Sequence, residues 1–270
     1  MNTLESQDLA GDFIATREYS ENVCESLETE DFGLQADAFV SPPKWHLAHT
    51  TWFFETFLLK PFAGAYKPFD AHFEVLFNSY YNAVGTQFPR AQRGLLSRPT
   101  LSQVLAYRQH VNHAMTRLLN EADHPRRQSI EERCRLGIEH EKQHQELFFT
   151  DIKYSLWANP MHPAVATGAP KSAGAGETRW RNYLGGLFEM GVEPGQMGFV
   201  FDNETPAHKV YLEPFELADR LVTNREYQAF VDAGGYQDPA YWLADGWATV
   251  QQQQWTRPLY WLDWQGKPME

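Results

Sequence analysis

The 270-residue chain has little cysteine and an excess of negative charge, and both features narrow its possible functions. The 2 cysteines, Cys24 and Cys134, are too few for a disulfide framework and suit the reducing cytoplasm. Lys and Arg number 23 against 35 Asp and Glu, which gives a formal net charge of −12 without any short basic run. Because nucleic-acid binding needs a concentrated basic face, we expect no nucleic-acid partner.

Long hydrophobic runs are also missing. The longest, around WFFETFLL, is far too short to span a bilayer, and the polar, acidic start MNTLESQDLAGDF is unlike a signal peptide. The chain does contain 43% hydrophobic and 14% aromatic residues, a composition typical of packed cores. We therefore expect a soluble cytoplasmic protein that does not engage a membrane, with one large or two ordinary domains.

Residues 1–160 show helical periodicity. The segment Ser41-Pro42-Pro43 is a helix start signal, and Asn159-Pro160 is a helix end. The predicted helices cover residues 4–30, 44–60, 101–121 and 128–157. Four long helices with one extended connection, roughly 61–100, predict a four-helix bundle, a fold that builds metal sites from side chains pointing into its interior.

The composition changes near residue 160. Residues 161–178 are rich in Pro, Gly, Ala and Ser, which is typical of a linker. Beyond them, GGLFEMGV and HKVYLEPFELA predict strands, and TNREYQAFVDAGG predicts a short helix with Thr223 or Asn224 as its cap. The QQQQ run at 251–254 predicts an exposed turn or strand edge. We expect a mainly α bundle followed by an α+β domain over residues 179–270.

The stretch IEHEKQHQELFF contains H-E-x-x-H, formed by His140 and His144, which is the usual motif of zinc metalloproteases. Residues four apart on a helix lie on one face, so the two imidazoles can share a metal. Leu147 and Phe148 continue this face as apolar residues, which predicts that the pair points into the bundle.

A third candidate ligand comes from WHLAHTTWFFE, where His46 and His49 are three residues apart. A bundle can bring His49 across to the helix that carries the other pair. Three imidazoles from two helices predict a metal site, and their chemistry suits either zinc or ferrous iron. The remaining coordination positions would be open to substrate, O2 or water.

The protease interpretation requires further ligands that this chain lacks. One version needs glycine and histidine where the chain has Leu147 and Thr150. The other takes a glutamate from a following helix of the same domain, but Glu177 is the next glutamate after the helix and lies at the far end of the predicted linker. Glu141 then becomes a helix-surface residue without a general-base role.

Longer segments carry a family resemblance. SPPKWHLAHTTWFFETF, FNSYYNAVG, PRAQRGLLSRPT and RCRLGIEHEKQHQELFFTDIKYSL resemble the DinB-like bundle of the sulfoxide synthases of ergothioneine biosynthesis, the hercynine oxygenases. GGLFEMG, FDNETPAHKVYLEPFELADRLVTNREYQAFVDAGGY and WLADGWATV resemble the start of that family's second domain, which has the formylglycine-generating-enzyme (C-type-lectin-like) fold. Related enzymes that join cysteine to histidine for ovothiol share both domain types.

The resemblance implies an iron(II) enzyme, with Fe(2+) as cofactor. It uses O2 to join the thiol of γ-glutamylcysteine or cysteine to C2 of hercynine, an Nα-trimethylated histidine, and gives a sulfoxide. The family's iron ligands correspond to His49, His140 and His144 in this chain. His46 falls outside this set, and we expect it either to be structural or to support a ligand from behind.

The resemblance also implies substrate contacts. Gln143 corresponds to a glutamine that hydrogen-bonds the substrate imidazole, and Arg90 and Arg93 in PRAQRG match arginines that hold the carboxylates of the thiol substrate. Guanidinium groups recognise carboxylates bidentately, so the residue type fits this role.

The chain ends at WLDWQGKPME, before such a second domain is complete. In the family, the later part of that domain supplies a tyrosine that assists the chemistry, so we expect the catalytic residues beyond residue 270. Two other classes remain open. One is a DinB-like metal-dependent thiol transferase that works without O2, and the other is a non-catalytic metal- or partner-binding module.

Overall fold

The computed structural model describes residues 8–79, 81–165, 174, 176–193 and 198–261. The chain divides into two compact units, Met1–Gly168 and Ala169–Glu270. Much of the predicted linker, 161–178, lies outside the described residues. Within the described ranges, no helix has both the length and the apolar character needed to cross a membrane.

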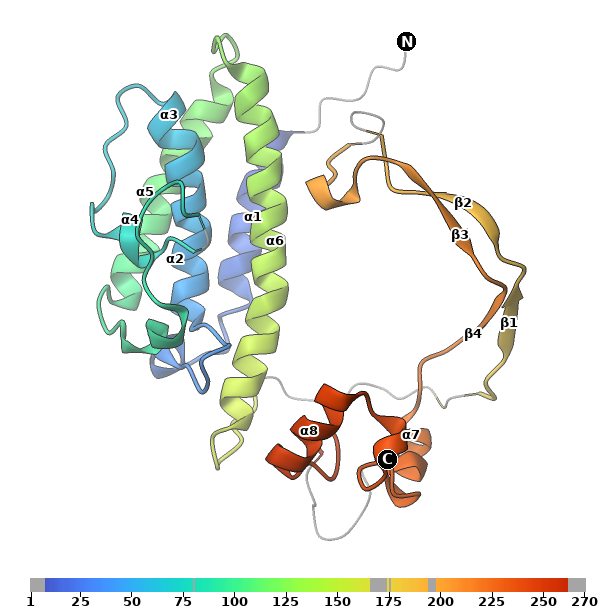
Figure 1. Ribbon diagram of the computed structural model, residues 1–270. Coiled ribbons are helices and arrows are strands. Elements are labelled where there is room, and N and C mark those ends of the chain that lie inside the picture. Colours follow the sequence, from blue (N-terminus) through green and yellow to red (C-terminus); the bar gives the residue numbers. More distant parts are fainter. Residues whose placement is uncertain (1–7, 80, 166–173, 175, 194–197, 262–270) are drawn as a thin grey trace. The chain divides into compact units, whose positions relative to one another are not determined.

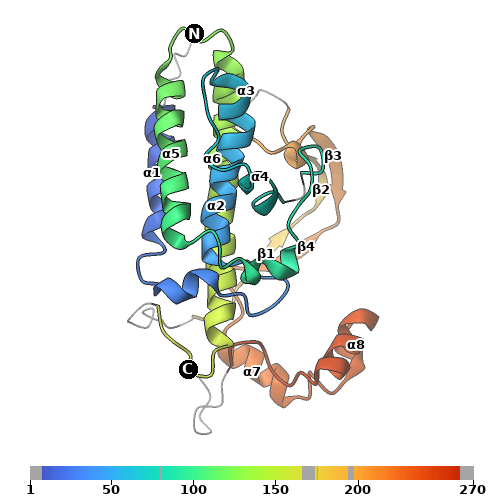
Figure 2. The same cartoon turned by 90° about the vertical axis from the view of Figure 1, so that its left-hand side faces the viewer.

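The first unit is a bundle of four long helices, which run side by side in both views (Figures 1 and 2). They are α1 (Leu9–Asn22), α2 (Pro43–Phe54), α5 (Leu101–Asn120) and α6 (Arg127–Trp157). The predicted fold class, a mainly α bundle followed by an α+β region, is confirmed.

The first helix is shorter than the predicted 4–30, because α1 ends at Asn22. A separate 3-10 helix, η1, follows at Thr29–Gly33. The acidic residues after α1 cap this new helix instead of extending the old one, since the Asp31 carboxylate accepts a hydrogen bond from the Glu28 backbone N–H at 3.0 Å.

Helix α2 continues without a break through a π-helical turn, η2 (Glu55–Leu59), into α3 (Lys60–Phe62). The Glu55 side chain is buried and accepts hydrogen bonds from the Tyr66 hydroxyl, the Phe69 backbone N–H at 3.2 Å and the Tyr107 hydroxyl at 2.8 Å. These bonds tie the start of the long connection to the bundle. The connection contains two further short elements, α4 (Phe73–Leu76) and η3 (Arg90–Leu95).

A glycine allows α6 to approach α2 closely, one turn before His140. A Cβ at Gly137 would lie 2.5 Å from Phe54 Cε1, so a larger residue would push the two helices apart. The aromatic core of the bundle packs around this contact, and its fully buried members include Phe13, Trp52, Phe54 and Tyr107. The helix pair that carries the candidate ligands is therefore fixed by close packing.

The described residues of the second unit form two antiparallel strand pairs, two α-helices and two short 3-10 helices, η4 (Asp202–Glu204) and η5 (Pro239–Tyr241). Strand β1 (Trp180–Tyr183) pairs with β4 (Phe215–Ala218), and β2 (Gly186–Met190) pairs with β3 (His208–Leu212). Helix α7 (Asn224–Asp232) begins at the predicted cap, Thr223, whose hydroxyl accepts from the Glu226 backbone N–H at 3.3 Å.

The glutamine run lies in a helix, so the prediction of a turn or strand edge at 251–254 is wrong. Helix α8 (Ala244–Gln253) includes the first three glutamines, and Gln254 ends it in a left-handed conformation with φ 52°. Glutamine is a good helix former, and the run extends a helix that has already begun at Ala244.

Candidate metal centre

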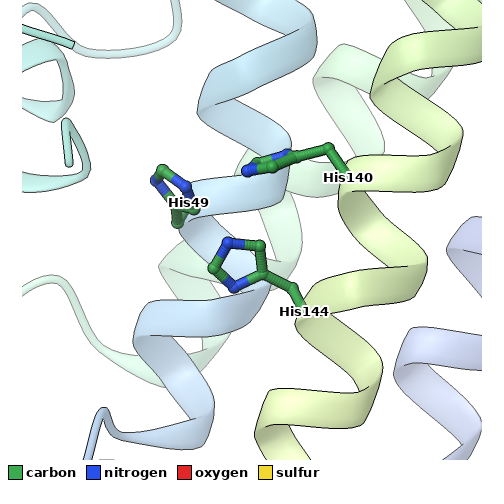
Figure 3. A group of neighbouring side chains, drawn as sticks. All are labelled: His49, His140 and His144. Carbon is green, nitrogen blue, oxygen red and sulfur yellow. The ribbon is translucent and has the colours of Figure 1, made fainter. Parts of the chain in front are cut away.

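Three histidines from two helices converge inside the bundle. His49 comes from α2, and His140 and His144 come from successive turns of α6 (Figure 3). One ring nitrogen of each lies within 4.8 Å of those of the other two. Among the described residues, no other set of three His, Cys, Asp or Glu side chains comes together in this way. These are the three residues whose spacing in the sequence predicts a metal site.

His49 is held in one orientation by stacking and by a backbone hydrogen bond. Its ring is stacked against Trp45, at 4.5 Å between centroids, and against Trp52, at 5.6 Å. The His49 Nδ1 atom lies 2.6 Å from the Phe77 carbonyl oxygen, so it must carry the proton and donate. The other nitrogen, Nε2, is left with a bare lone pair that can bind a metal.

The Nδ1 atom of His144 faces a histidine side chain, whereas that of His49 faces a backbone carbonyl. The Nδ1 atoms of His144 and His46 lie 3.0 Å apart, and His46 Nε2 lies 3.0 Å from Asp151 Oδ2. His46 is buried and is not one of the three converging residues. Sequence reasoning did not identify Asp151, although it lies seven residues after His144, two turns further along the same face of α6.

His140 supplies the observation that tests whether a metal fits. Its Nδ1 atom is buried and has no hydrogen-bond partner within the described structure. Burial lowers the pKa of His140 to about 4, and it also lowers the pKa of His49 and of His144 well below the ordinary value. At neutral pH all three imidazoles are therefore neutral nitrogen donors, which is the form that binds divalent metals. The residues fit such an ion.

The low pKa of His140 predicts how the metal-free protein responds to acid. The unfolded chain takes up a proton near the ordinary pKa of 6.5, whereas the folded site does not until about pH 4. The free energy of unfolding should therefore fall as the pH decreases from 6.5 to 4. In His140→Phe, the new ring would pack beside Phe53. The free energy of unfolding, measured by urea titration at a series of pH values, should then change with pH less steeply, by the contribution of about one proton. An unchanged slope would contradict the burial of a neutral His140.

Glu141, the glutamate of H-E-x-x-H, is fully buried, so its predicted position on the helix surface is wrong. Its two carboxylate oxygens accept from Arg17 and Ser20, each at 2.7 Å, and from Arg108 at 3.2 Å. Burial alone would raise the pKa of Glu141, but the two arginines outweigh it and the pKa is lowered. A carboxylate engaged by two guanidinium groups is a poor general base, which argues against a metalloprotease.

The predicted interior face of α6 is correct only in part. Phe148 is buried with 4% of its surface exposed, whereas Leu147 is 40% exposed. Gln143, between His140 and His144 in the sequence, is also exposed. This side of α6 therefore presents Gln143 and Leu147 to the surface beside the histidine cluster.

The two arginines predicted to bind substrate have different surroundings. Arg90 is exposed and donates to the Phe39 carbonyl oxygen. Arg93 is buried, its guanidinium carbon lies 3.3 Å from the centre of the Trp45 ring, and it donates to the hydroxyls of Ser41 and Ser79, each at 2.9 Å. Arg93 therefore supports the indole that stacks on His49, and Arg90 is the more accessible of the two.

Comparison with known proteins places the chain in a family. Residues 12–148, which include all three converging histidines, match the family described as the DinB superfamily. The chain belongs to the DinB superfamily. Residues 182–265 match a second family, described as the sulfatase-modifying factor enzyme 1-like domain. The order of the two domains is the one expected from the family resemblance.

Relatives with assigned names agree with this pair of domains. A hercynine oxygenase from Mycolicibacterium smegmatis is 36% identical over 131 residues, 48% of this chain and 30% of the relative. Another from Mycolicibacterium thermoresistibile is 30% identical over 237 residues, 84% of this chain and 49% of the relative. A formylglycine-generating enzyme from Streptomyces coelicolor is 41% identical over 75 residues, 27% of this chain and 24% of the relative.

These findings confirm the resemblance to the hercynine-oxygenase family. The chain spans about half the length, or less, of the curated relatives that it matches.

Proposed function

We propose that the chain carries the iron(II) site of an O2-dependent sulfoxide synthase. Its substrates would be hercynine and the thiol of γ-glutamylcysteine or cysteine, joined at C2 of the hercynine imidazole. The observation that most supports this proposal is the cluster of three neutral imidazoles in a bundle similar to that of hercynine oxygenases. Three protein ligands leave coordination positions for other molecules.

The reaction balances without a further reductant. The thiol loses its S–H hydrogen, C2 of hercynine loses its hydrogen, and a C–S bond forms between the two atoms. The sulfur gains one atom of O2, and the other oxygen atom leaves as water with the two hydrogens. O2 is the four-electron oxidant, two electrons coming from C–S bond formation and two from oxidation of the sulfur.

The residues of this chain would hold and surround the ion. His49, His140 and His144 would be its ligands, and ferrous iron, when bound, would make the thiol more acidic and supply the redox chemistry with O2. The indoles of Trp45 and Trp52 stack on the His49 ring, which is buried. Because the three imidazoles are neutral, they would not compensate the positive charge of the ion, which would favour binding of an anionic thiolate.

Gln143 and Arg90 remain proposed substrate contacts. Gln143 is exposed between the two ligand histidines of α6, where its amide can hydrogen-bond the imidazole of hercynine. Arg90 is exposed and can donate to a carboxylate of the thiol.

Replacing Arg90 with glutamine should affect one substrate only. Losing a charge-assisted hydrogen bond costs about 1.5–3 kcal/mol, so the KM for the thiol should rise roughly 10- to 100-fold while the KM for hercynine changes little. Steady-state kinetics with each substrate varied in turn measures the split. Arg98→Gln is a matched control, because Arg98 is an exposed arginine of the same connection that donates to the Ser97 carbonyl oxygen. Equal increases in both KM values would reject the role of Arg90.

The activity itself is tested by O2 uptake. The full-length protein, loaded with iron, is mixed with hercynine and either γ-glutamylcysteine or cysteine, and the product is analysed by mass spectrometry. The product should contain one oxygen atom more and two hydrogen atoms fewer than the two substrates combined. Histidine in place of hercynine tests the ovothiol-type reaction, and product formation without O2 would instead indicate a thiol transferase. If none of the thiols supports O2 uptake with hercynine, the proposal is wrong.

A further inference from the structure

Two further side chains, His46 and Asp151, form a hydrogen-bonded relay that supports His144 on the side away from the other candidate ligands. His46 is 4% exposed and Asp151 is 6% exposed, so water does not compete for these contacts. Asp151 Oδ2 also accepts the backbone N–H of Ser41 at 2.8 Å. The Ser41 hydroxyl in turn accepts from Arg93. The relay is therefore anchored to the bundle at Asp151.

The positions of the protons in the relay follow from the Asp151 carboxylate, which is the acceptor at its end. A carboxylate oxygen can only accept, so His46 Nε2 carries a hydrogen and donates to Asp151. A neutral His46 then has a bare Nδ1 atom, which can only accept. The facing Nδ1 of His144, at 3.0 Å, must supply the hydrogen. Nε2 of His144 is left as the bare nitrogen.

We propose that His46 and Asp151 are positioning residues that fix the tautomer of His144 and present its Nε2 lone pair to the metal. This inference rests on the metal site proposed above, but not on the reaction that the metal supports. Histidine ligands are commonly oriented by a hydrogen-bond acceptor on their second nitrogen. Here His46 would be that acceptor, and the Asp151 carboxylate would orient His46 in turn.

The three candidate ligands differ in how their tautomers are set. The backbone carbonyl of Phe77 fixes His49, and the side-chain relay fixes His144. The Nδ1 atom of His140 has no partner in the described structure. His144 is therefore the ligand whose tautomer can be changed by a side-chain substitution, and His49 is an internal reference in the same protein.

The first test reads the tautomer directly in the metal-free wild-type protein. Two-dimensional 15N NMR of the imidazole nitrogens distinguishes a hydrogen on Nδ1 from one on Nε2. We expect His49 and His144 to carry it on Nδ1 and His46 to carry it on Nε2. A His144 ring protonated on Nε2 would overturn the proposal, and this measurement needs no variant.

The second test cuts the relay while keeping its far end satisfied. In His46→Gln, the side-chain amide can still donate to Asp151, but the imidazole Nδ1 that faces Nδ1 of His144 is removed. Co(II), a spectroscopic probe for the site, should bind about 10- to 100-fold more weakly, with an altered d–d spectrum. His124→Gln is the matched control, because His124 is a half-buried histidine whose Nε2 contacts the Phe62 carbonyl oxygen in a different part of the bundle.

A double-mutant cycle separates a relay from two independent structural contacts. Asp151→Asn removes the charge and should weaken Co(II) binding on its own, but it should add little in the His46→Gln background, where the relay is already cut. Additive losses, or Co(II) binding by His46→Gln as tight as in wild type, would overturn the proposal. Failure of O2 uptake would leave these results standing, because neither the tautomer nor Co(II) affinity depends on turnover.

Discussion

Replacing His140 with alanine should abolish tight metal binding while the protein stays folded. Structural zinc sites yield about 10–16 kcal/mol from four ligands, so one imidazole is worth about 3 kcal/mol, or roughly 100-fold in affinity. The fold should survive, because the buried Nδ1 of His140 makes no hydrogen bond that the substitution would break. Competition between the protein and a chelating dye for Fe(II) or Co(II) measures the affinity.

The control for this experiment is His113→Ala. His113 is an exposed histidine on α5, so its loss should leave metal affinity unchanged. Hercynine-dependent O2 uptake should disappear in His140→Ala and persist in His113→Ala. Wild-type metal affinity in His140→Ala would mean that the converging histidines are a structural cluster and not a metal site.

Replacing Glu141 with alanine should cause a large loss of stability, in contrast to His140→Ala, which should stay folded. The carboxylate lies between Arg17 and Arg108, which are both almost completely buried. Removing one partner from a buried ion pair leaves uncompensated charge and typically costs about 3–5 kcal/mol. Domains of this kind are stable by about 5–15 kcal/mol, so the urea midpoint of the metal-free protein should fall steeply.

A nearby glutamate provides the control. Glu146 lies on the same helix but is exposed, so Glu146→Ala should change the free energy of unfolding by no more than about 0.5 kcal/mol. The comparison also decides the meaning of H-E-x-x-H. In a metalloprotease the glutamate is needed for turnover rather than for folding, so normal stability in Glu141→Ala would contradict the present assignment.

The convergence of the three histidines could be predicted from sequence because it depends on local geometry. His140 and His144 lie four apart on a long helix, and His49 lies on a second helix with an apolar sequence around it. Helical spacing fixes which side chains share a face, and a bundle turns apolar faces inward. The one further requirement for the three histidines to converge is that the two helices pack against each other.

The supporting contacts could not be predicted because they join distant segments. The Phe77 carbonyl that orients His49 belongs to the long connection, and Arg93 from the same connection covers Trp45. Helical spacing says nothing about where such a connection packs. Gln143, Arg90 and Arg93 came from the family resemblance alone, and their substrate roles stay predictions.

The buried charge of Glu141 did leave a signal in the sequence. On α6 it falls in line with the buried residues Cys134, Gly137 and Phe148, and on α5 Arg108 falls between Tyr107 and Val111. A charge on an apolar stripe must find a partner on another stripe, because an unpaired buried charge is too costly. Opposite charges on the inner faces of two helices therefore predict a buried ion pair.

The central claim is that His49, His140 and His144 together hold one metal ion. X-ray absorption spectroscopy of the iron-loaded protein, combined with metal analysis, tests it most directly. We predict one iron per chain with three imidazole ligands, and loss of the iron in each of the three single alanine variants. An iron bound through carboxylates, or retained when any one of these histidines is replaced, would contradict the account.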